Sequence, residues 1–121
     1  MRPADCTILY LEDEIIVALD TVQTLEDMGF AEVKLVHNLR KAEAIAAEHP
    51  PHCALLDVNI SGEGLSLDFG RSLIAQGVTV VFASGYNRSE MEAEYEGLMF
   101  VEKPLNAEAI AAAFDRAVAA A

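Results

Sequence analysis

Short apolar runs recur along the chain and alternate with longer segments in which apolar and polar residues are mixed. A continuous apolar run that ends in polar or turn-forming residues is typical of a strand buried on both faces of a parallel sheet. The third run shows this most clearly, because its apolar residues lead into Asp57 and then into a Gly-rich loop. The five predicted strands cover residues 6–11, 33–36, 53–57, 78–83 and 98–101.

The segment after the first predicted strand carries apolar residues at helical spacing. The apolar face predicted for this helix consists of Ile15, Ile16, Leu19, Val22 and Leu25. Gly29 is expected to end the helix, because glycine readily adopts the backbone conformation that closes helices. The acidic residues at its start suit the positive end of the helix dipole.

Later segments repeat this helical spacing. Their predicted apolar faces are Leu39, Ala42, Ile45 and Ala46, then Leu65, Leu67, Phe69, Leu73 and Ile74, and finally Ile110, Phe114 and Val118. Asn38 is placed to cap the first of these helices and Gly77 to end the second. Residues 87–96 are very polar, so a helix there is expected to be short, exposed and weakly held.

Strands that alternate with helices predict a parallel sheet with right-handed crossovers and helices on both faces. We therefore expect an α/β fold with a doubly wound, five-stranded parallel sheet. The 121 residues suffice for one domain with one core, and the sequence has no recognisable repeat or linker. The expected organisation is a single domain over residues 1–121.

Composition narrows the classes of function. The formal net charge of −12 argues against binding of nucleic acid through its phosphates and is compatible with a site for a divalent cation. No apolar run approaches the roughly 20 residues of a membrane-spanning helix, so we expect a soluble, cytoplasmic protein without membrane contacts. Cys6 and Cys53 are expected to be small buried residues, without a disulfide or a zinc site.

Polar side chains suited to chemistry follow four of the five predicted strands. Glu12 and Asp13 follow the first, Asp57 ends the third, Ser84 follows the fourth and Lys103 follows the fifth. Because the carboxyl ends of parallel strands meet at one edge of a sheet, we expect these residues to converge. Alone, each would be an ordinary turn or helix-start residue. Their joint occurrence at one edge indicates a site.

The predicted cluster has the composition of a phosphoryl-accepting centre. Neighbouring carboxylates such as Glu12, Asp13 and Asp57 cannot all stay ionised without a cation. Mg²⁺ suits such a cluster, because it binds a few carboxylate oxygens and retains several waters. With Lys103 as a fixed positive charge and Ser84 as a hydroxyl donor, the carboxylate of Asp57 could attack a phosphoryl group in line.

This arrangement resembles the receiver domain of two-component response regulators over essentially the whole chain. The motifs that carry the resemblance are Leu-Glu12-Asp13-Glu, Leu-Leu-Asp57-Val-Asn, Ala83-Ser84-Gly85 and Lys103-Pro104. The resemblance implies the flavodoxin-like receiver fold with strand order 2-1-3-4-5. It also implies a protein that a histidine kinase phosphorylates, with self-catalysed phosphorylation and dephosphorylation as its only chemistry, and therefore not an enzyme.

The resemblance assigns roles to individual positions. It implies Asp57 as the phosphoacceptor assisted by Lys103 and Ser84, a Mg²⁺ site of Glu12, Asp13, Asp57 and the backbone carbonyl of Asn59, and switch positions at Ser84, Phe100 and Tyr86. Glu12 stands where the family commonly has aspartate, and Ser84 where it commonly has threonine. Both substitutions retain the required functional group, so we expect an active receiver.

The run Phe82-Ala83-Ser84-Gly85-Tyr86 resembles the "FAT GUY" subgroup of receivers. This narrower resemblance implies stress or light signalling with a histidine kinase of the HWE type. We expect a stand-alone receiver without an output domain. Such a protein would act either through contacts with a downstream regulatory protein or as a phosphate sink that drains a shared kinase.

Two other classes of protein share either the aspartyl-phosphate chemistry or the topology predicted here. A haloacid-dehalogenase-type phosphatase also forms an aspartyl phosphate, but it needs a second carboxylate two residues after the nucleophile, where this chain has Asn59. A flavodoxin-like flavin binder needs a phosphate-cradling loop after the first strand. The acidic segment Glu12-Asp13-Glu14 would repel a phosphate there.

Overall fold

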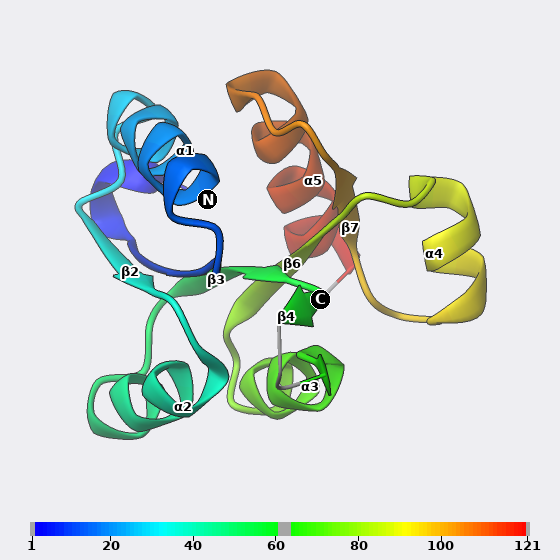
Figure 1. Cartoon of the computed structure of the whole chain (residues 1–121), viewed down its shortest axis with the longest axis horizontal. Coiled ribbons are helices and arrows are strands. Elements are labelled where there is room, and N and C mark those ends of the chain that lie inside the picture. Colours follow the sequence, from blue (N-terminus) through cyan, green and yellow to red (C-terminus); the bar gives the residue numbers. More distant parts are fainter. Residues whose placement is uncertain (1, 61–63, 121) are drawn as a thin grey trace.

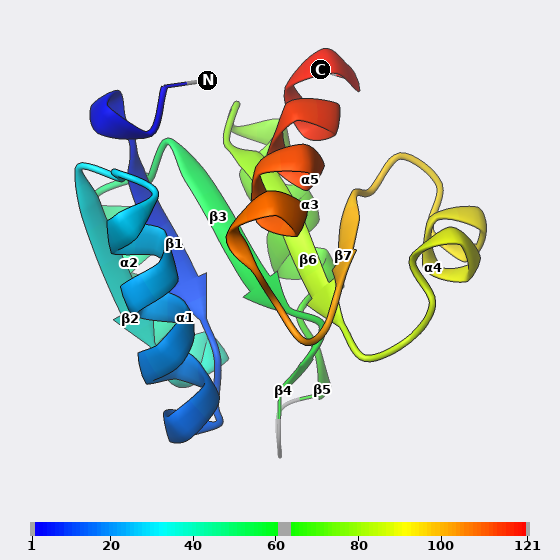
Figure 2. The ribbon, with the colours of Figure 1, turned by 90° about the horizontal axis from the view of Figure 1, so that it is seen from above.

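β3 (Cys53–Asp57) is the central strand of the sheet in the computed structural model, which describes residues 2–60 and 64–120. All residues of β3 are buried, as predicted for a strand covered on both faces. The parallel sheet has the order β2-β1-β3-β6-β7 (Figures 1 and 2). The other strands are β1 (Thr7–Leu11), β2 (Glu32–Val36), β6 (Thr79–Ser84) and β7 (Phe100–Glu102).

Two short strands, β4 (Asn59–Ile60) and β5 (Gly64–Leu65), pair antiparallel outside this sheet. The hairpin that they form lies beyond the carboxyl end of β3 (Figure 2). Without them, the order of the five-stranded sheet is 2-1-3-4-5 in sequence, which confirms the predicted topology. The predicted strand boundaries differ from the observed ones by at most about two residues, as is usual at element ends.

Helices cover both faces of the sheet and one of its edges (Figure 1). On one face lie α1 (Ile15–Asp27) and α5 (Ala107–Ala120), and on the other α2 (Leu39–Glu48) and α3 (Leu67–Ala75). α4 (Arg88–Glu94) lies beside the edge strand β7. No helix among the described residues is long and apolar enough to cross a membrane.

The helix ends follow the sequence signals. Asn38 caps α2, since its side-chain oxygen accepts a hydrogen bond from the Lys41 N–H at 2.8 Å. Gly29 and Gly77, just beyond α1 and α3, have φ values of +95° and +89°, a conformation that glycine adopts without strain. α4 is short and mostly exposed, as the polar segment predicts, with Met91 buried and Arg88 and Glu92 half-buried.

Alternation along the strands divides the core into two apolar clusters. Ala54 and Leu56 of β3 face the α2–α3 side, whereas Cys53 and Leu55 face the α1–α5 side. Cys6 belongs to the same cluster as Cys53, and both cysteines are buried, as predicted. Burial raises the pKa of the Cys53 thiol to about 12.

The predicted apolar face of α1 is partly wrong. The helix buries Ala18, Thr21 and Leu25 against the sheet. Both sides of this helix carry apolar residues at helical spacing, so the spacing alone did not identify the inner side. The exposed apolar residues, with their exposed fractions, are Ile15 (61%), Ile16 (85%) and Leu19 (62%).

Two further face predictions need correction. Leu65 lies in β5 and is exposed, because the hairpin ends there and α3 begins only at Leu67. Ile74, at the end of α3, is also exposed. Val118 lies in the last turn of α5, beyond the residues of this helix that are buried on the sheet, and is 41% exposed.

Candidate functional site

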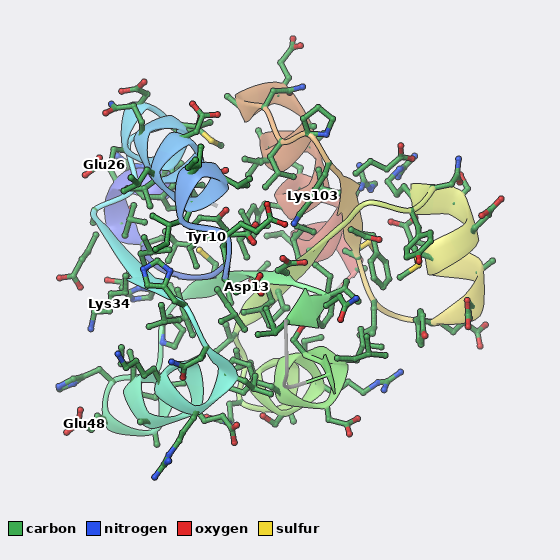
Figure 3. The ribbon with its side chains drawn as sticks, viewed as in Figure 1. Tyr10, Asp13, Glu26, Lys34, Glu48 and Lys103 are labelled. Atoms are coloured by element: carbon green, nitrogen blue, oxygen red, sulfur yellow. The ribbon has the colours of Figure 1, made fainter. Side chains whose placement is uncertain are left out.

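The carboxyl ends of the strands bring the predicted site residues together. Leu11 of β1 pairs with Leu56 of β3, so the next residues, Glu12 and Asp57, are neighbours at the edge of the sheet. Alternation also places both on the face covered by α1 and α5. Lys103 follows β7 and approaches from the segment that leads into α5 (Figure 3).

Lys103 connects two acids that come from different strands. Its Nζ lies 3.0 Å from Asp57 Oδ2 and 3.2 Å from Glu12 Oε1. Burial by itself would lower the pKa of this ammonium group, but hydrogen bonding and charge interaction with Asp57, and then with Glu12, outweigh burial and raise the pKa. Lys103 is therefore held in its charged form against both carboxylates.

Glu12 is fully buried. Its Oε2 accepts a hydrogen bond from the Glu14 N–H at 3.3 Å, and its backbone carbonyl accepts one from the ring of His37 at 3.0 Å. Burial, together with hydrogen bonding and charge interaction with Asp57, raises the pKa of the Glu12 carboxyl to about 7. The Glu14 N–H and the Lys103 ammonium oppose this rise without cancelling it.

The acidic cluster fits a divalent cation. Glu12, Asp13 and Asp57 each present a carboxylate oxygen, and these oxygens lie within 4.8 Å of one another. A set of hard oxygen donors at this spacing is what Mg²⁺ prefers. Burial first, and then Asp57, raise the pKa of Glu12, and the positive charge of Lys103 does not offset both. The residues present thus suit the predicted cation, in chemistry as well as in position.

The backbone around Asp57 is held by contacts that the sequence pattern did not reveal. Ser66, which is fully buried, donates its hydroxyl hydrogen to the backbone carbonyl of Asp57 at 2.6 Å. The Asn59 N–H donates to Asp57 Oδ1 at 3.3 Å. Ser66 lies between Leu65 and Leu67, the first two residues of the predicted helical face, and a lone serine there carries no signal beyond that of a helix start.

The predicted switch residues lie in β6, in β7 and in the segment that follows β6. They are thus on the side of Asp57 away from β1. Ser84 is buried, and its Oγ accepts a hydrogen bond from the Tyr86 N–H at 3.0 Å. Tyr86 itself is 72% exposed. Phe100 is fully buried, and its ring centroid lies 5.5 Å from that of Phe82. The structure therefore places Ser84 close to the acidic cluster, Tyr86 at the surface and Phe100 in the core.

Two depressions flank Asp57 and Lys103. One, of about 320 Å³, is bordered by Asp57, Ser84 and residues of α4. The other, of about 600 Å³, is bordered by Lys103 and by Ile16 and Thr21 of α1. The Asp57 side chain is only 9% exposed, so a reacting group has narrow access to it.

Several solved response regulators have structures similar to this chain. The chemotaxis protein CheY4 of Vibrio cholerae aligns with a TM-score of 0.76 at 21% identity, over 92% of this chain and 97% of CheY4. The receiver domain of PhyR from Erythrobacter litoralis aligns with a TM-score of 0.76 at 18% identity, over 93% of this chain and 89% of that domain. The anti-anti-sigma factor PhyR from Bartonella quintana aligns with a TM-score of 0.77 at 21% identity, over 93% of this chain and 47% of PhyR.

These alignments establish that the chain has the receiver fold, which confirms the resemblance drawn from its motifs. The chain spans about half the length of the PhyR proteins that it matches. No protein-family model matches the chain, and no curated protein matches its sequence.

Proposed function

We propose that this chain is a response-regulator receiver that accepts a phosphoryl group on Asp57. The observation that carries the proposal is the contact of Asp57 with Lys103, at 3.0 Å, in a nearly buried position between two depressions. A carboxylate held against a fixed ammonium group, with an acidic cation site beside it, provides a nucleophile and the charge that phosphoryl transfer requires.

In the proposed reaction, a carboxylate oxygen of Asp57 attacks the phosphorus atom of a phosphohistidine on the donor. The new O–P bond forms as the N–P bond breaks, and the imidazole nitrogen keeps the bonding electron pair. Lys103 already lies against the same carboxylate and would pair with the oxygens of the transferred group. Ser84 would have to turn its hydroxyl away from the Tyr86 N–H to reach that group.

Glu12, Asp13 and Asp57 would hold the cation, with the backbone carbonyl of Asn59 as a further predicted ligand. When bound, Mg²⁺ supplies positive charge that neutralises the acids and the transferring oxygens. The protein's own contribution is to keep Glu12 out of water and Lys103 charged. Both conditions strengthen electrostatic interactions at the site.

A histidine kinase is the donor that we propose. Ile15, Ile16 and Leu19 form an exposed apolar patch on α1, and Ile16 also borders the depression next to Lys103. Apolar side chains that rim a nearly buried acceptor suit a protein donor better than a small phosphate compound. The HWE type of kinase, and membership of the "FAT GUY" subgroup, remain predictions from the sequence.

We propose that the phosphorylated protein acts in one of two ways. It either contacts a downstream regulatory protein or serves as a phosphate sink for a shared kinase. One surface that could change on phosphorylation consists of α4, β7 and α5. PhyR is described as a stress response regulator, and its likeness in fold supports the predicted role in stress signalling. A phosphoaspartate that persists for many minutes without a phosphatase would argue against the phosphate sink and for the regulatory contact.

Intact mass spectrometry tests the central proposal. The full chain is incubated with Mg²⁺ and acetyl phosphate, beside Asp57→Asn and the control Asp68→Asn, which changes an exposed carboxyl on α3. We expect one phosphoryl adduct on the wild type and on the control, none on Asp57→Asn, and none after Mg²⁺ is chelated. An adduct that survives in Asp57→Asn would place the acceptor elsewhere.

A phosphatase of the haloacid-dehalogenase type remains the alternative, because it too forms an aspartyl phosphate. The general acid that such an enzyme needs is replaced by Asn59, which is exposed and donates its backbone N–H to Asp57. We propose instead that the protein turns over no substrate. Steady hydrolysis of p-nitrophenyl phosphate that is lost in Asp57→Asn would favour the phosphatase.

A further inference from the structure

Ser66 uses its hydroxyl group differently from most serines at the start of a helix. It is the N-cap residue of α3, a position where a serine oxygen commonly accepts a hydrogen bond from an N–H of the first helical turn. Among the described residues, no such capping bond forms at Ser66. The hydroxyl instead donates to the backbone carbonyl of Asp57, nine residues earlier, at 2.6 Å. The helix thus lacks a side-chain cap, and the proposed phosphoacceptor gains a contact.

The carbonyl of Asp57 needs a donor because it lies beyond the paired part of its strand. The pairing of β3 with β1 ends at Leu56. On the other side, the Val58 N–H donates to the Ala83 carbonyl of β6 at 3.0 Å. Because the C=O and N–H of a planar trans peptide point in opposite directions, the Asp57 carbonyl points away from β6. A buried carbonyl without a partner is costly, and Ser66 supplies the partner.

A second bond from Ser66 closes the segment that follows the acceptor. The Ser66 N–H donates to the Val58 carbonyl at 2.9 Å, so two consecutive carbonyls accept hydrogen bonds from one residue. The hairpin of β4 and β5 lies between these contacts along the chain and beyond the carboxyl end of β3 (Figure 2). Its first residue, Asn59, donates its N–H to Asp57 Oδ1 at 3.3 Å. Ser66 therefore fixes the base of the hairpin that places Asn59 against the acceptor carboxylate.

Burial and a third contact make Ser66 a joint between elements. It is fully buried, so water does not readily replace its hydroxyl at the Asp57 carbonyl. Its own carbonyl accepts a hydrogen bond from the Gly70 N–H at 3.0 Å, in the first turn of α3. One residue thereby connects the end of β3, the hairpin and α3. Because a displacement of about 1 Å can slow a reaction by about 100-fold, such a joint can control the rate at the acceptor.

We propose that Ser66 is a positioning residue for phosphorylation, whose hydroxyl holds the backbone of Asp57 so that the carboxylate keeps its place against Lys103. The inference rests on the proposed function, because it requires Asp57 to be the acceptor. Loss of the hydroxyl should therefore lower the maximal rate of phosphorylation without weakening the binding of the phosphate donor. A residue that only stabilises the fold would change neither quantity while the protein is folded.

Phosphorylation of the full chain by acetyl phosphate with Mg²⁺ tests this inference, with intact mass followed over time at several donor concentrations. The variants are Ser66→Ala and the control Ser72→Ala, which removes an exposed hydroxyl that donates to the Phe69 carbonyl of α3 at 2.8 Å. We expect Ser66→Ala to lower the maximal rate by about ten-fold and to leave the half-saturating concentration of acetyl phosphate unchanged. Ser72→Ala should match the wild type in both quantities.

A further control separates positioning from stability. Ser66→Ala leaves a buried carbonyl without its donor, so it should unfold at a lower urea concentration than the wild type. Phe30→Leu should also lower this concentration, but it changes a buried residue just before β2, at the edge of the sheet opposite Asp57. Only Ser66→Ala should react more slowly while fully folded. Equal slowing in both variants would attribute the effect to stability and overturn the role of Ser66.

Hydrogen exchange of the unphosphorylated protein gives a readout that does not depend on the reaction. In Ser66→Ala the Asn59 amide should exchange faster, because the base of the hairpin has lost one of its two bonds. The Leu9 amide in the middle of β1 should exchange as in the wild type. Unchanged exchange at Asn59 would overturn the inference.

The outcomes also separate this inference from the proposed function. If the wild type forms no adduct, the proposed function fails, and the role of Ser66 in it fails as well. If the wild type is phosphorylated and Ser66→Ala reaches the same maximal rate, only the role of Ser66 is overturned.

Discussion

At the carboxyl edge of the sheet, one face carries charged side chains and the other carries aromatic side chains. On the α1–α5 face, the strands lead into Glu12, Asp57 and Lys103, which are linked by contacts of 3.0 and 3.2 Å. On the opposite face, near the same edge, the aromatic rings of Phe82 and Phe100 pack together without charge. One face thus fixes charge at the acceptor, and the other connects the edge strand to α4 by apolar packing. Substitutions on the two faces should therefore separate phosphorylation from conformational coupling.

The link between β7 and α4 depends on side chains that form hydrogen bonds with the backbone of β7. Glu92 of α4 accepts a hydrogen bond from the Phe100 N–H at 3.2 Å, and Arg116 of α5 donates one to the Phe100 carbonyl at 3.1 Å. Glu92 and Arg116 also lie 3.8 Å apart as an ion pair. The ring of Tyr95 packs on Phe100 from the end of α4. Phe100 is therefore held through its backbone as well as its ring.

The largest expected effect lies on the charged face. Lys103→Met keeps the length of the side chain and removes the ammonium group from Asp57 and Glu12. We expect phosphorylation by acetyl phosphate to slow by about 100- to 1,000-fold, because one charge-stabilising donor is lost from the transition state. The rate is measured by intact mass against the control Lys34→Met on the edge strand β2. An unchanged rate would contradict the role of Lys103.

The next largest effect is expected in the pH dependence of the unfolding free energy. It is measured on metal-free protein in a chelating buffer. The pKa of Glu12 rises from 4.5 to about 7 on folding. A raised carboxyl pKa stabilises the folded state fully below pH 4.5, and this contribution is lost as the pH rises through about 7. The loss is on the order of 3 kcal/mol over that range.

Glu12→Gln is the matched variant, since it cannot ionise but keeps the shape of the side chain. The groups that face Glu12 are Asp57, Lys103 and the phenol of Tyr10. We expect the unfolding free energy of Glu12→Gln to fall less between pH 5 and pH 8 than that of the wild type, by roughly the amount above. Equal slopes for the two proteins would show that Glu12 ionises normally in the folded state.

These residues also show how far the sequence could be used to predict the site. Glu12, Asp57 and Lys103 were identifiable because each lies at or just after the end of an apolar strand, and parallel strands bring their ends together. Ser66 was not, because its contact with Asp57 depends on which way a hydroxyl faces in the folded chain. A serine before a helix is common for other reasons.

The fold shows the same division between local pattern and tertiary contact. The order of the sheet follows from the alternation of strands and helices, which is local information. The inner face of α1 does not, because both Ile16 and Leu25 fit the helical spacing and only the sheet determines which is buried. Likewise, no spacing rule predicts that Gly70 of α3 must lie against the ring of Phe82.

A substitution at Gly70 should have a smaller effect on stability, on the face of the sheet that α2 and α3 cover. A Cβ atom at this position would overlap Cζ of Phe82, whose ring is fully buried. Gly70→Ala should therefore lower the unfolding free energy by about 1–3 kcal/mol, despite the gain in helix propensity. Urea unfolding measures this loss. Gly85→Ala is the control, because no atom of the described residues, apart from its chain neighbours, lies within 4 Å of its Cβ position.

The comparison of the two faces predicts that Gly70→Ala leaves the chemistry intact. Under native conditions, the folded variant should be phosphorylated by acetyl phosphate at the wild-type rate, because Phe82 lies on the face opposite Asp57 and Lys103. A slower rate in fully folded Gly70→Ala would mean that packing beneath α3 positions the acceptor. The two faces would then not be independent.

The smallest effect is expected at the link between α4 and β7. Glu92→Gln keeps an oxygen for the Phe100 N–H but removes the charge that strengthens this bond and the ion pair with Arg116. A weakened charge-assisted bond of this kind costs about 1 kcal/mol, so the Phe100 amide should exchange its hydrogen about five-fold faster. Native-state hydrogen exchange measures this rate, with Glu94→Gln on the same helix as the control.

Which amides exchange faster in Glu92→Gln is more informative than how much faster they exchange. If α4 is coupled to the sheet through Phe100, faster exchange in Glu92→Gln should extend over α4 and Phe100 and should spare the amides of β1 and β3. Phosphorylation of Asp57 should then slow exchange in α4 of the wild type more than in the variant, because the variant has lost part of the link. Equal responses in both proteins would mean that the signal leaves Asp57 by a route other than Glu92 and the edge strand.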